Sequence, residues 1–207
     1  DLAGGKATAA PAFADPDRLE TYPWWAPDGR SLYFCSAPIP WTRRDRMPPD
    51  GYDQLRYDLS RARFDPESGA WGPRETLLSA STTGKSILLP RPSPDGRWVL
   101  FCMCQYGCFP IYQSSSDLYL LDLKTGKYRA LDALNSPRSE SWHSWSSNSR
   151  WIVYSSKRDD GVFTRTYIAH VAPDGTVGKP FILPQKDPDF YDSDLKTFTV
   201  PELTVEP

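Results

Sequence analysis

The stretch PSPDGRWVLFC, residues 92–102, decides the fold that is expected for this chain. Pro94-Asp95-Gly96 carries a hairpin-turn signal, because glycine tolerates the positive φ that such a turn requires. The residues from Trp98 to Cys102 are all apolar, unlike the alternating pattern of a strand with one exposed face. The stretch therefore predicts a tight turn followed by a strand that is buried on both faces.

The same pattern occurs twice more along the chain. WAPDGRSLYFCS spans residues 25–36, and WSSNSRWIVYSS spans residues 145–156. In the third copy Asn148-Ser149 replaces Asp-Gly, and Asn-Ser can still form the turn. After the second copy, residues 117–123 and 128–131 add two strands around a short turn, and comparable pairs follow the other copies. Four strands in a unit of about fifty residues are typical of a propeller blade.

We therefore predict an all-β fold made of β-propeller blades with four antiparallel strands each. Three blades are recognisable, at residues 20–80, 81–134 and 135–184. Residues 1–19 are expected to be a linker or a strand of a preceding blade, and residues 185–207 a tail whose segment 195–200 is a candidate ring-closing strand. Three blades cannot close a ring, so the chain is expected to be part of a six- to eight-bladed propeller. No segment shows the periodicity of an amphipathic helix.

At these three copies the sequence resembles the TolB-like, WD-type propeller repeat family. The resemblance covers roughly residues 20–184 and is carried by the turn, its arginine and the apolar strand. It implies a toroid of six or seven blades, usually in the bacterial periplasm, that binds proteins or small ligands. It implies no catalytic residues, because the repeat motif is structural.

Composition narrows the classes of partner. The chain has 207 residues and a formal net charge of -2, with a pI near 5.7. This balance provides no electrostatic footprint for nucleic acid, and no apolar run is long enough to span a bilayer. The chain begins at Asp1 without a visible leader, so we expect a processed chain or a fragment whose missing part held an export signal. A periplasmic or extracellular location in a bacterium follows as an expectation.

The four cysteines are disulfide candidates, because an even count suits an exported protein. Cys104 and Cys108 flank a short turn and could close a small loop, and Cys35 could then reach Cys102. Sequence alone does not choose among the three possible pairings. The alternative is four buried free thiols.

The inner strands supply one set of candidate binding residues. Aligning the copies places His143 level with Pro23 and Pro90, and places Trp24 and Arg91 level with each other near the central channel. A histidine beside serine and tryptophan also invites a catalytic interpretation, but the chain lacks a Gly-x-Ser-x-Gly elbow. A hydrogen-bonded histidine on an inner strand is the simpler interpretation.

The loops that follow the buried strands supply a second set. Residues 37–52, 109–113 and 157–163 occupy equivalent places in the three blades, so they are expected to cluster on one face and to form a binding surface. The candidate contact residues there are Trp41, Arg43, Arg44, Phe109, Tyr112 and Arg158. Alanine at Trp41 and Arg44 is expected to weaken partner capture. The alternative is solvated loops that pack on their own blades.

No metal site or cofactor is expected. Cys104 to Cys108 has the wrong spacing for haem attachment, and zinc would require more Cys or His nearby. Four aspartates between Lys186 and Asp194 do not match an EF-hand loop, so a solvated acidic loop is favoured over a calcium site.

The resulting hypothesis is a non-catalytic propeller scaffold for protein–protein binding, with a protein partner or partner chain that completes the ring, in an exported bacterial complex. The alternative is the propeller domain or subunit of an enzyme, such as a prolyl-oligopeptidase-like peptidase or a multihaem redox complex, whose catalytic part lies elsewhere. Carbohydrate binding on Trp24 or Trp41 is a third hypothesis.

Overall fold

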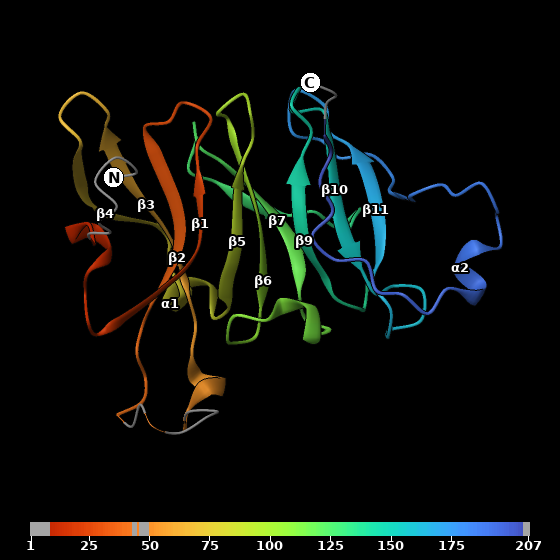
Figure 1. Ribbon diagram of the computed structural model, residues 1–207, viewed down its shortest axis with the longest axis horizontal. Coiled ribbons are helices and arrows are strands. Elements are labelled where there is room, and N and C mark those ends of the chain that lie inside the picture. The colour runs from red at the N-terminus through yellow and green to blue at the C-terminus, as the bar shows by residue number, and fades with distance from the viewer. Residues whose placement is uncertain (1–8, 43–44, 46–49, 205–207) are drawn as a thin grey trace, which may run out of the picture.

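The computed structural model describes residues 9–42, 45 and 50–204. Within these residues the strands form three four-stranded sheets, each with its strands in sequence order and with antiparallel pairing throughout. The sheets stand side by side along the longest axis of the molecule (Figure 1). The prediction of propeller blades with four antiparallel strands is confirmed.

The three sheets are named blades 1, 2 and 3. Blade 1 contains β1 (Arg18–Trp25), β2 (Ser31–Pro38), β3 (Asp58–Asp65) and β4 (Ala70–Leu78). Blade 2 contains β5 (Ser86–Pro92), β6 (Trp98–Cys104), β7 (Asp117–Asp122) and β8 (Tyr128–Ala130). Blade 3 contains β9 (Glu140–Trp145), β10 (Trp151–Ser156), β11 (Arg165–His170) and β12 (Phe181–Ile182).

Helical structure among the described residues is limited to single turns. The α-helices are α1 (Ala80–Thr83) and α2 (Phe190–Ser193), and the 3-10 helices are η1 (Pro11–Phe13), η2 (Tyr52–Gln54) and η3 (Pro110–Tyr112). Segments this short cannot show a 3.6-residue hydrophobic period, which is why the sequence pattern predicts none of them. Helix α1 ends at Gly84, which adopts the left-handed conformation that is common at helix C-termini.

The three sequence copies form the same turn. The side-chain oxygen of Asp28 accepts a hydrogen bond from the backbone N–H of Arg30, at 2.8 Å. Asp95 does the same for Arg97 at 3.1 Å, and Asn148 for Arg150 at 3.0 Å. The next residue has a positive φ in each copy, 64° at Gly29, 71° at Gly96 and 58° at Ser149. The third copy therefore keeps the turn although it lacks the glycine.

Each inner strand also contains a bulge that sequence analysis did not identify. The register shifts between Thr21 and Trp24 in β1, and equivalent shifts occur in β5 and β9. Two residues of the inner strand thus lie opposite one residue of the second strand. The first residue of each bulge has a positive φ: Tyr22, Leu89 and Trp142. The bulge places Trp24, Arg91 and Ser144 at equivalent positions, as the alignment of the copies predicts.

The second strand of blade 2 packs against both neighbouring blades. Phe101 is completely buried in a cluster with Tyr33 and Leu59 of blade 1. Leu100 points to the other side and shares a cluster with Tyr154 of blade 3. The strand is therefore buried on both faces, as its apolar sequence predicts.

The terminal segments cover the two outer blade faces. Phe13 of η1 makes an edge contact with Phe34 at 4.9 Å on the outer side of blade 1. On blade 3 the tail runs back from α2 toward the end of β9 (Figure 1). On the way, Phe198 O accepts a hydrogen bond from Ser155 Oγ of β10 at 3.2 Å. Residues 195–200 do not form the expected ring-closing strand. Among the described residues they make one backbone–backbone hydrogen bond, from Phe198 N to Thr164 O just before β11, and one bond is too few for a strand pairing.

We expect Phe101→Ala to destabilise the protein by about 3–5 kcal/mol, because it removes a completely buried ring between two blades. Tyr112→Ala removes a ring that is 79% exposed and is expected to change stability by less than about 0.5 kcal/mol. Chemical denaturation followed by circular dichroism measures both values. A loss below about 1 kcal/mol for Phe101→Ala would contradict the packing of blades 1 and 2.

Candidate functional site

Three loops meet on one side of the blades, which we call the loop face: residues 39–57, 105–116 and 157–164. The first two loops are joined by a backbone hydrogen bond from Gly107 N to Leu55 O of 2.8 Å. The rings of Tyr52 and Tyr106 pack edge to face at 6.0 Å. Gly107 has a φ of +68°, and a Cβ there would lie 2.5 Å from Tyr52 Oη. Only glycine allows this close approach.

The third loop joins the second through the start of blade 3. Ser139 Oγ donates to Pro110 O at 3.1 Å, and Lys157 N donates to Ser139 O at 3.0 Å. The Lys157 ammonium lies 5.5 Å from the centre of the Tyr112 ring. The contacts bring the three equivalent loops together, as the blade alignment predicts.

Two aromatic side chains stand out from this face. Phe109 is 53% exposed and Tyr112 is 79% exposed, and their ring centres are 6.4 Å apart. Both belong to a loop whose backbone is fixed by the contacts above. Trp41 is half-buried against the main core. Arg43 and Arg44, the other candidates in its loop, lie outside the described residues.

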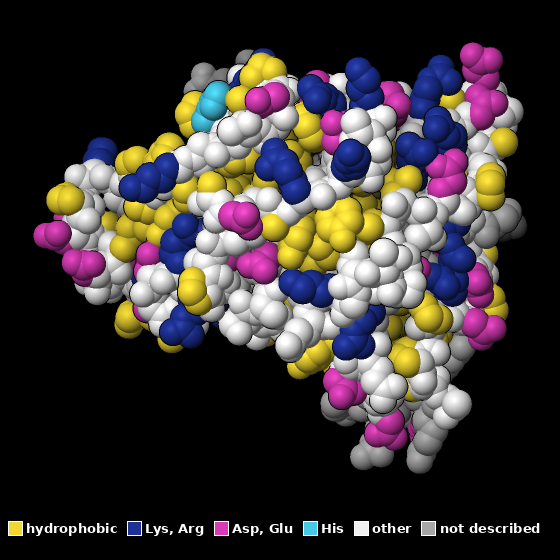
Figure 2. Space-filling view, turned by 180° about the vertical axis from the view of Figure 1, so that it is seen from behind, with side chains coloured by type: hydrophobic (Ala, Val, Ile, Leu, Met, Phe, Trp, Pro, Cys, Tyr) yellow, Lys and Arg dark blue, Asp and Glu magenta, His cyan; other side chains and the backbone are white. Residues whose placement is uncertain are grey.

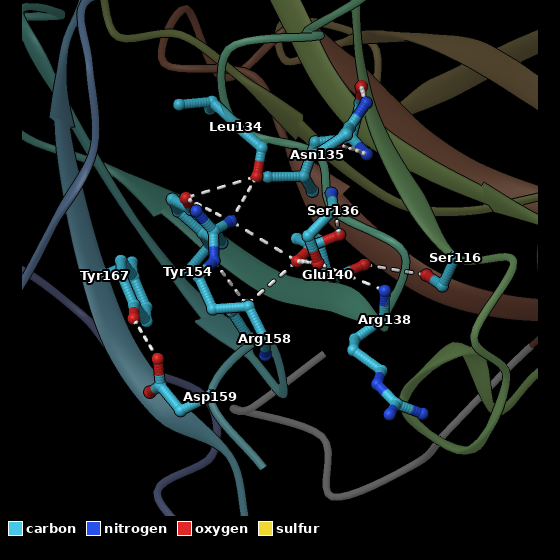
Figure 3. Close-up of polar contacts among 12 residues, drawn as sticks. Ser116, Leu134, Asn135, Ser136, Arg138, Glu140, Tyr154, Arg158, Asp159 and Tyr167 are labelled. Carbon is cyan, nitrogen blue, oxygen red and sulfur yellow. Dashed lines mark hydrogen bonds and ion pairs between the residues drawn. The ribbon is translucent and has the colours of Figure 1, made fainter. Parts of the chain in front are cut away.

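Arg158 points into the protein instead of contributing to the surface (Figure 3). Its guanidinium lies 3.3 Å from Glu140 Oε1, whose residue has no exposed area. It also donates to Leu134 O and, at 3.0 Å, to Tyr154 Oη. The guanidinium packs over the Tyr167 ring at 4.4 Å. Arg158 is therefore an internal anchor for the third loop, and the predicted surface role does not fit its position.

The Glu140 carboxylate is the acceptor at the centre of this network. Ser136 Oγ donates to it at 2.6 Å and Ser156 Oγ at 2.8 Å. Burial raises the pKa of Glu140, and the hydrogen bonds from Ser136 and Ser156 and the charge of Arg158 oppose that shift. The same Glu–Ser pair recurs in blade 1, where Ser36 Oγ donates to Glu20 at 3.3 Å. Pairing this glutamate with an arginine could not be inferred from the sequence copies, because the arginine lies beyond the repeated strand.

The other ends of the inner strands hold a second group of candidate residues. The Arg91 guanidinium stacks on Trp24 at 3.5 Å, and Nε donates to His143 O at 3.3 Å. Trp145 Nε1 donates to Arg91 O at 2.9 Å. Burial lowers the pKa of Arg91 to about 10, and the negative charge of Glu202 opposes this shift. These contacts bring together Trp24 and Arg91, which the sequence copies place level with each other, and His143, which they place one position earlier.

His143 is a core residue. Its Nε2 lies 2.8 Å from Leu89 O and 3.2 Å from Leu100 O, so this nitrogen carries the proton. Among the described residues Nδ1 has no hydrogen-bond partner. Burial, assisted by the nearby Arg91 cation, lowers the pKa of His143 to about 3. This imidazole is therefore neutral near pH 7, and it bonds two backbone carbonyls as the simpler interpretation of the sequence expects.

The predicted disulfides are absent: all four cysteines are free thiols. Cys102 Sγ donates to Leu88 O at 3.6 Å and Cys104 Sγ to Tyr106 O at 3.3 Å, so these thiols bond backbone carbonyls and not each other. Burial raises the pKa of Cys35 and Cys102, and raises that of Cys104 to about 12. These three thiols are protonated at neutral pH, which makes them poor nucleophiles.

No group of three or more His, Cys, Asp or Glu side chains in the described part of the chain could hold a metal ion. Two of the aspartates of residues 187–194 accept hydrogen bonds from nearby backbone N–H groups: Asp187 from Asp189 N at 3.0 Å and Asp194 from Lys196 N at 3.2 Å. No helix among the described residues is long and apolar enough to cross a membrane.

Comparison with known proteins shows similarity in fold only. No family model matches the chain, and no curated protein matches it significantly. Among solved structures, an oligogalacturonate lyase in complex with manganese is 14% identical, with a TM-score of 0.54, over 83% of this chain and 43% of that chain. TolB from Acinetobacter baumannii is 17% identical, with a TM-score of 0.46, over 78% of this chain and 32% of that one.

The propeller domain of the Trilobed protease from Pyrococcus furiosus is 14% identical, with a TM-score of 0.47, over 83% of this chain and 45% of that one. The fold is a partial β-propeller. The expected propeller fold is confirmed by the three four-stranded sheets and by the likeness to the lyase, and the similar structures include TolB proteins. This partial propeller spans less than half of each of the three structures compared above. Two of the three come from enzymes. Sequence identities this low support a shared fold and nothing about activity.

We expect Arg158→Ala to destabilise the protein by about 3 kcal/mol, because Glu140 would remain buried without its cation. The matched control is Arg138→Ala, which changes an exposed arginine two residues before Glu140 and is expected to change stability by less than about 0.5 kcal/mol. Chemical denaturation measures both. Equal effects of the two substitutions would show that Arg158 is not an internal anchor.

Acid is expected to destabilise the protein through His143. Between its unfolded pKa of about 6.5 and its folded pKa of about 3, only the unfolded state binds the proton, so stability falls as pH falls through this window. From pH 7 to pH 4.5 the wild type should lose about 2–3 kcal/mol more than His143→Gln. Denaturation at both pH values measures the difference, and parallel losses in the two proteins would contradict the burial of a neutral imidazole.

Proposed function

We propose that this partial propeller is a non-catalytic scaffold that binds a protein partner through its loop face, as a subunit of an exported bacterial complex. The observation that carries the proposal is the pair of exposed rings, Phe109 and Tyr112, on a loop fixed by backbone and side-chain hydrogen bonds. Rigid aromatic side chains lose little entropy on binding and are favoured as interface anchors.

The electrostatics of the loop face support a protein partner of mixed polarity. Lys157 lies beside Tyr112, whereas Arg158 is neutralised internally by Glu140. Next to Tyr112 the face thus combines exposed aromatic area with the Lys157 cation, which suits a protein surface with an apolar patch and a polar rim. The exported location is part of the proposal and rests on the sequence resemblance.

The partner, or the part of the protein outside this chain, is proposed to complete the ring. The outer side of blade 1 supports this. There Trp25, Phe64 and Trp71 form an aromatic cluster with ring-centre distances of 4.9–5.6 Å, and Trp25 is 45% exposed. Figure 2 shows a further hydrophobic patch in the middle of the rear face, bordered by Lys and Arg side chains.

The double substitution Phe109→Ala/Tyr112→Ala is expected to lower partner affinity more than about tenfold, because aromatic anchors each contribute about 2 kcal/mol. Immobilised wild-type chain first captures its partner from a periplasmic extract, and the captured protein is then purified and titrated against each variant by calorimetry. Tyr128→Ala, which removes an exposed ring on β8, is the matched control and should bind like wild type. Unchanged affinity for the double variant, or an equal loss with Tyr128→Ala, would overturn the proposal.

A further inference from the structure

A pocket of about 240 Å³ lies at the turn ends of the inner strands. Trp24 of β1, Arg91 of β5 and Trp145 of β9 line it, so each blade contributes one wall. Prolines from the adjoining turns complete the apolar part of the lining. The pocket is on the opposite end of these strands from the loop face, because β1, β5 and β9 begin at the loop face and end at these turns.

The Arg91 guanidinium in this pocket has few partners for its N–H groups. Arg91 is held in place by stacking on Trp24 and by the bond from its Nε to His143 O. Among the described residues this is the only hydrogen bond that its guanidinium donates, and no carboxylate lies within ion-pair distance. A fixed guanidinium with free N–H groups is suited to bidentate binding of a carboxylate.

The tail of the chain reaches this pocket. Ser144 Oγ donates to Pro201 O at 2.8 Å, and Glu202 and Leu203 line the pocket. The backbone turns sharply just before it, at Val200, whose φ of 53° is unusual for a β-branched residue. Upstream, Phe198 is bonded to both Thr164 and Ser155. Glu202 and Leu203 of the tail therefore line the pocket, next to the Pro201 carbonyl that Ser144 binds.

We propose that this pocket is a binding site for an extended acidic peptide segment of a partner protein, and that Pro201–Leu203 occupies it in cis. The recognition chemistry is a Glu–Leu pair: the carboxylate binds the Arg91 guanidinium, the apolar side chain packs on tryptophan and proline, and the Ser144 hydroxyl binds a backbone carbonyl. Glu202 is exposed and makes no ion pair of 4 Å or less with Arg91 among the described residues, so the tail is a weak occupant. The tail is held at Phe198 and Pro201 by the sheet, whereas a separate peptide of the same sequence is free to bring its carboxylate to the guanidinium.

The test uses the full chain and a fluorescein-labelled peptide with the sequence of residues 198–204 as the probe. Wild type is expected to bind the probe weakly, because its own tail competes. Glu202→Ala weakens the tail and should bind the probe at least about fivefold more tightly. Adding Arg91→Ala to that variant should lower its affinity for the probe at least tenfold. A second probe, with Gln in place of Glu, should bind the Glu202→Ala protein as weakly as the first probe binds the double variant. Fluorescence anisotropy measures all four affinities.

Two controls decide the interpretation. Arg97→Ala in the Glu202→Ala background removes an exposed arginine of the neighbouring turn and should bind the probe as Glu202→Ala does. If the Arg91→Ala protein does not fold, Arg91→Lys keeps the charge but loses the planar stacked group, and should bind at least threefold more weakly. Equal binding by wild type and Glu202→Ala, or by Glu202→Ala with and without an Arg91 substitution, would overturn the proposal.

This inference does not depend on the loop face. Phe109→Ala/Tyr112→Ala lies at the other end of the blades and should bind the peptide probe like wild type. Conversely, Arg91→Lys should leave capture through the loop face unchanged. Peptide binding therefore tests the Arg91 pocket alone, and partner capture tests the loop face alone.

Discussion

The structure depends on one constraint: the second strand of every blade must be buried on both faces. Its side chains alternate between the preceding and the following blade, so that Phe101 meets blade 1 while Leu100 meets blade 3. Loss of either neighbour would expose a row of large apolar side chains to water, which costs about 25 cal/mol per Å². Each blade is therefore stable only when a neighbouring blade or another segment covers each of its faces, as in other repeat architectures.

This constraint explains the course of the two terminal segments. Blade 1 has no preceding sheet and blade 3 no following one, yet Phe34 and Ser155 are almost completely buried. On blade 1, η1 inserts Phe13 between Phe34 and Trp71. On blade 3, the tail offers backbone carbonyls to hydroxyl groups of the sheet. The two covers differ in chemistry, aromatic on one side and hydrogen-bonded on the other, and the second leads the tail into the Arg91 pocket.

Local signals made the blades predictable, and non-local contacts limited the prediction of the sites. The Asp-Gly and Asn-Ser turns determine their own conformation, so the hairpins and the equivalence of Trp24 and Arg91 followed from sequence. The interior position of Arg158 did not, because its partners Leu134 and Glu140 come from other segments. The sequence could not decide between disulfides and free thiols for a similar reason: backbone carbonyls that only the fold supplies accept hydrogen bonds from the thiols of Cys102 and Cys104. The inner-strand bulges have no single residue type in common and were not recognised.

Amide hydrogen exchange, read by mass spectrometry on short peptides, tests the central claim most directly. Strand β6 is enclosed by sheets on both faces, whereas β2 and β10 each have a sheet on one face and a terminal segment on the other. The account predicts that the amides of β6 exchange most slowly, and that those of β2 and β10 exchange faster by local release of the covers. Equal protection of the three strands, or slower exchange in β2 or β10 than in β6, would contradict the claim that neighbouring blades stabilise one another.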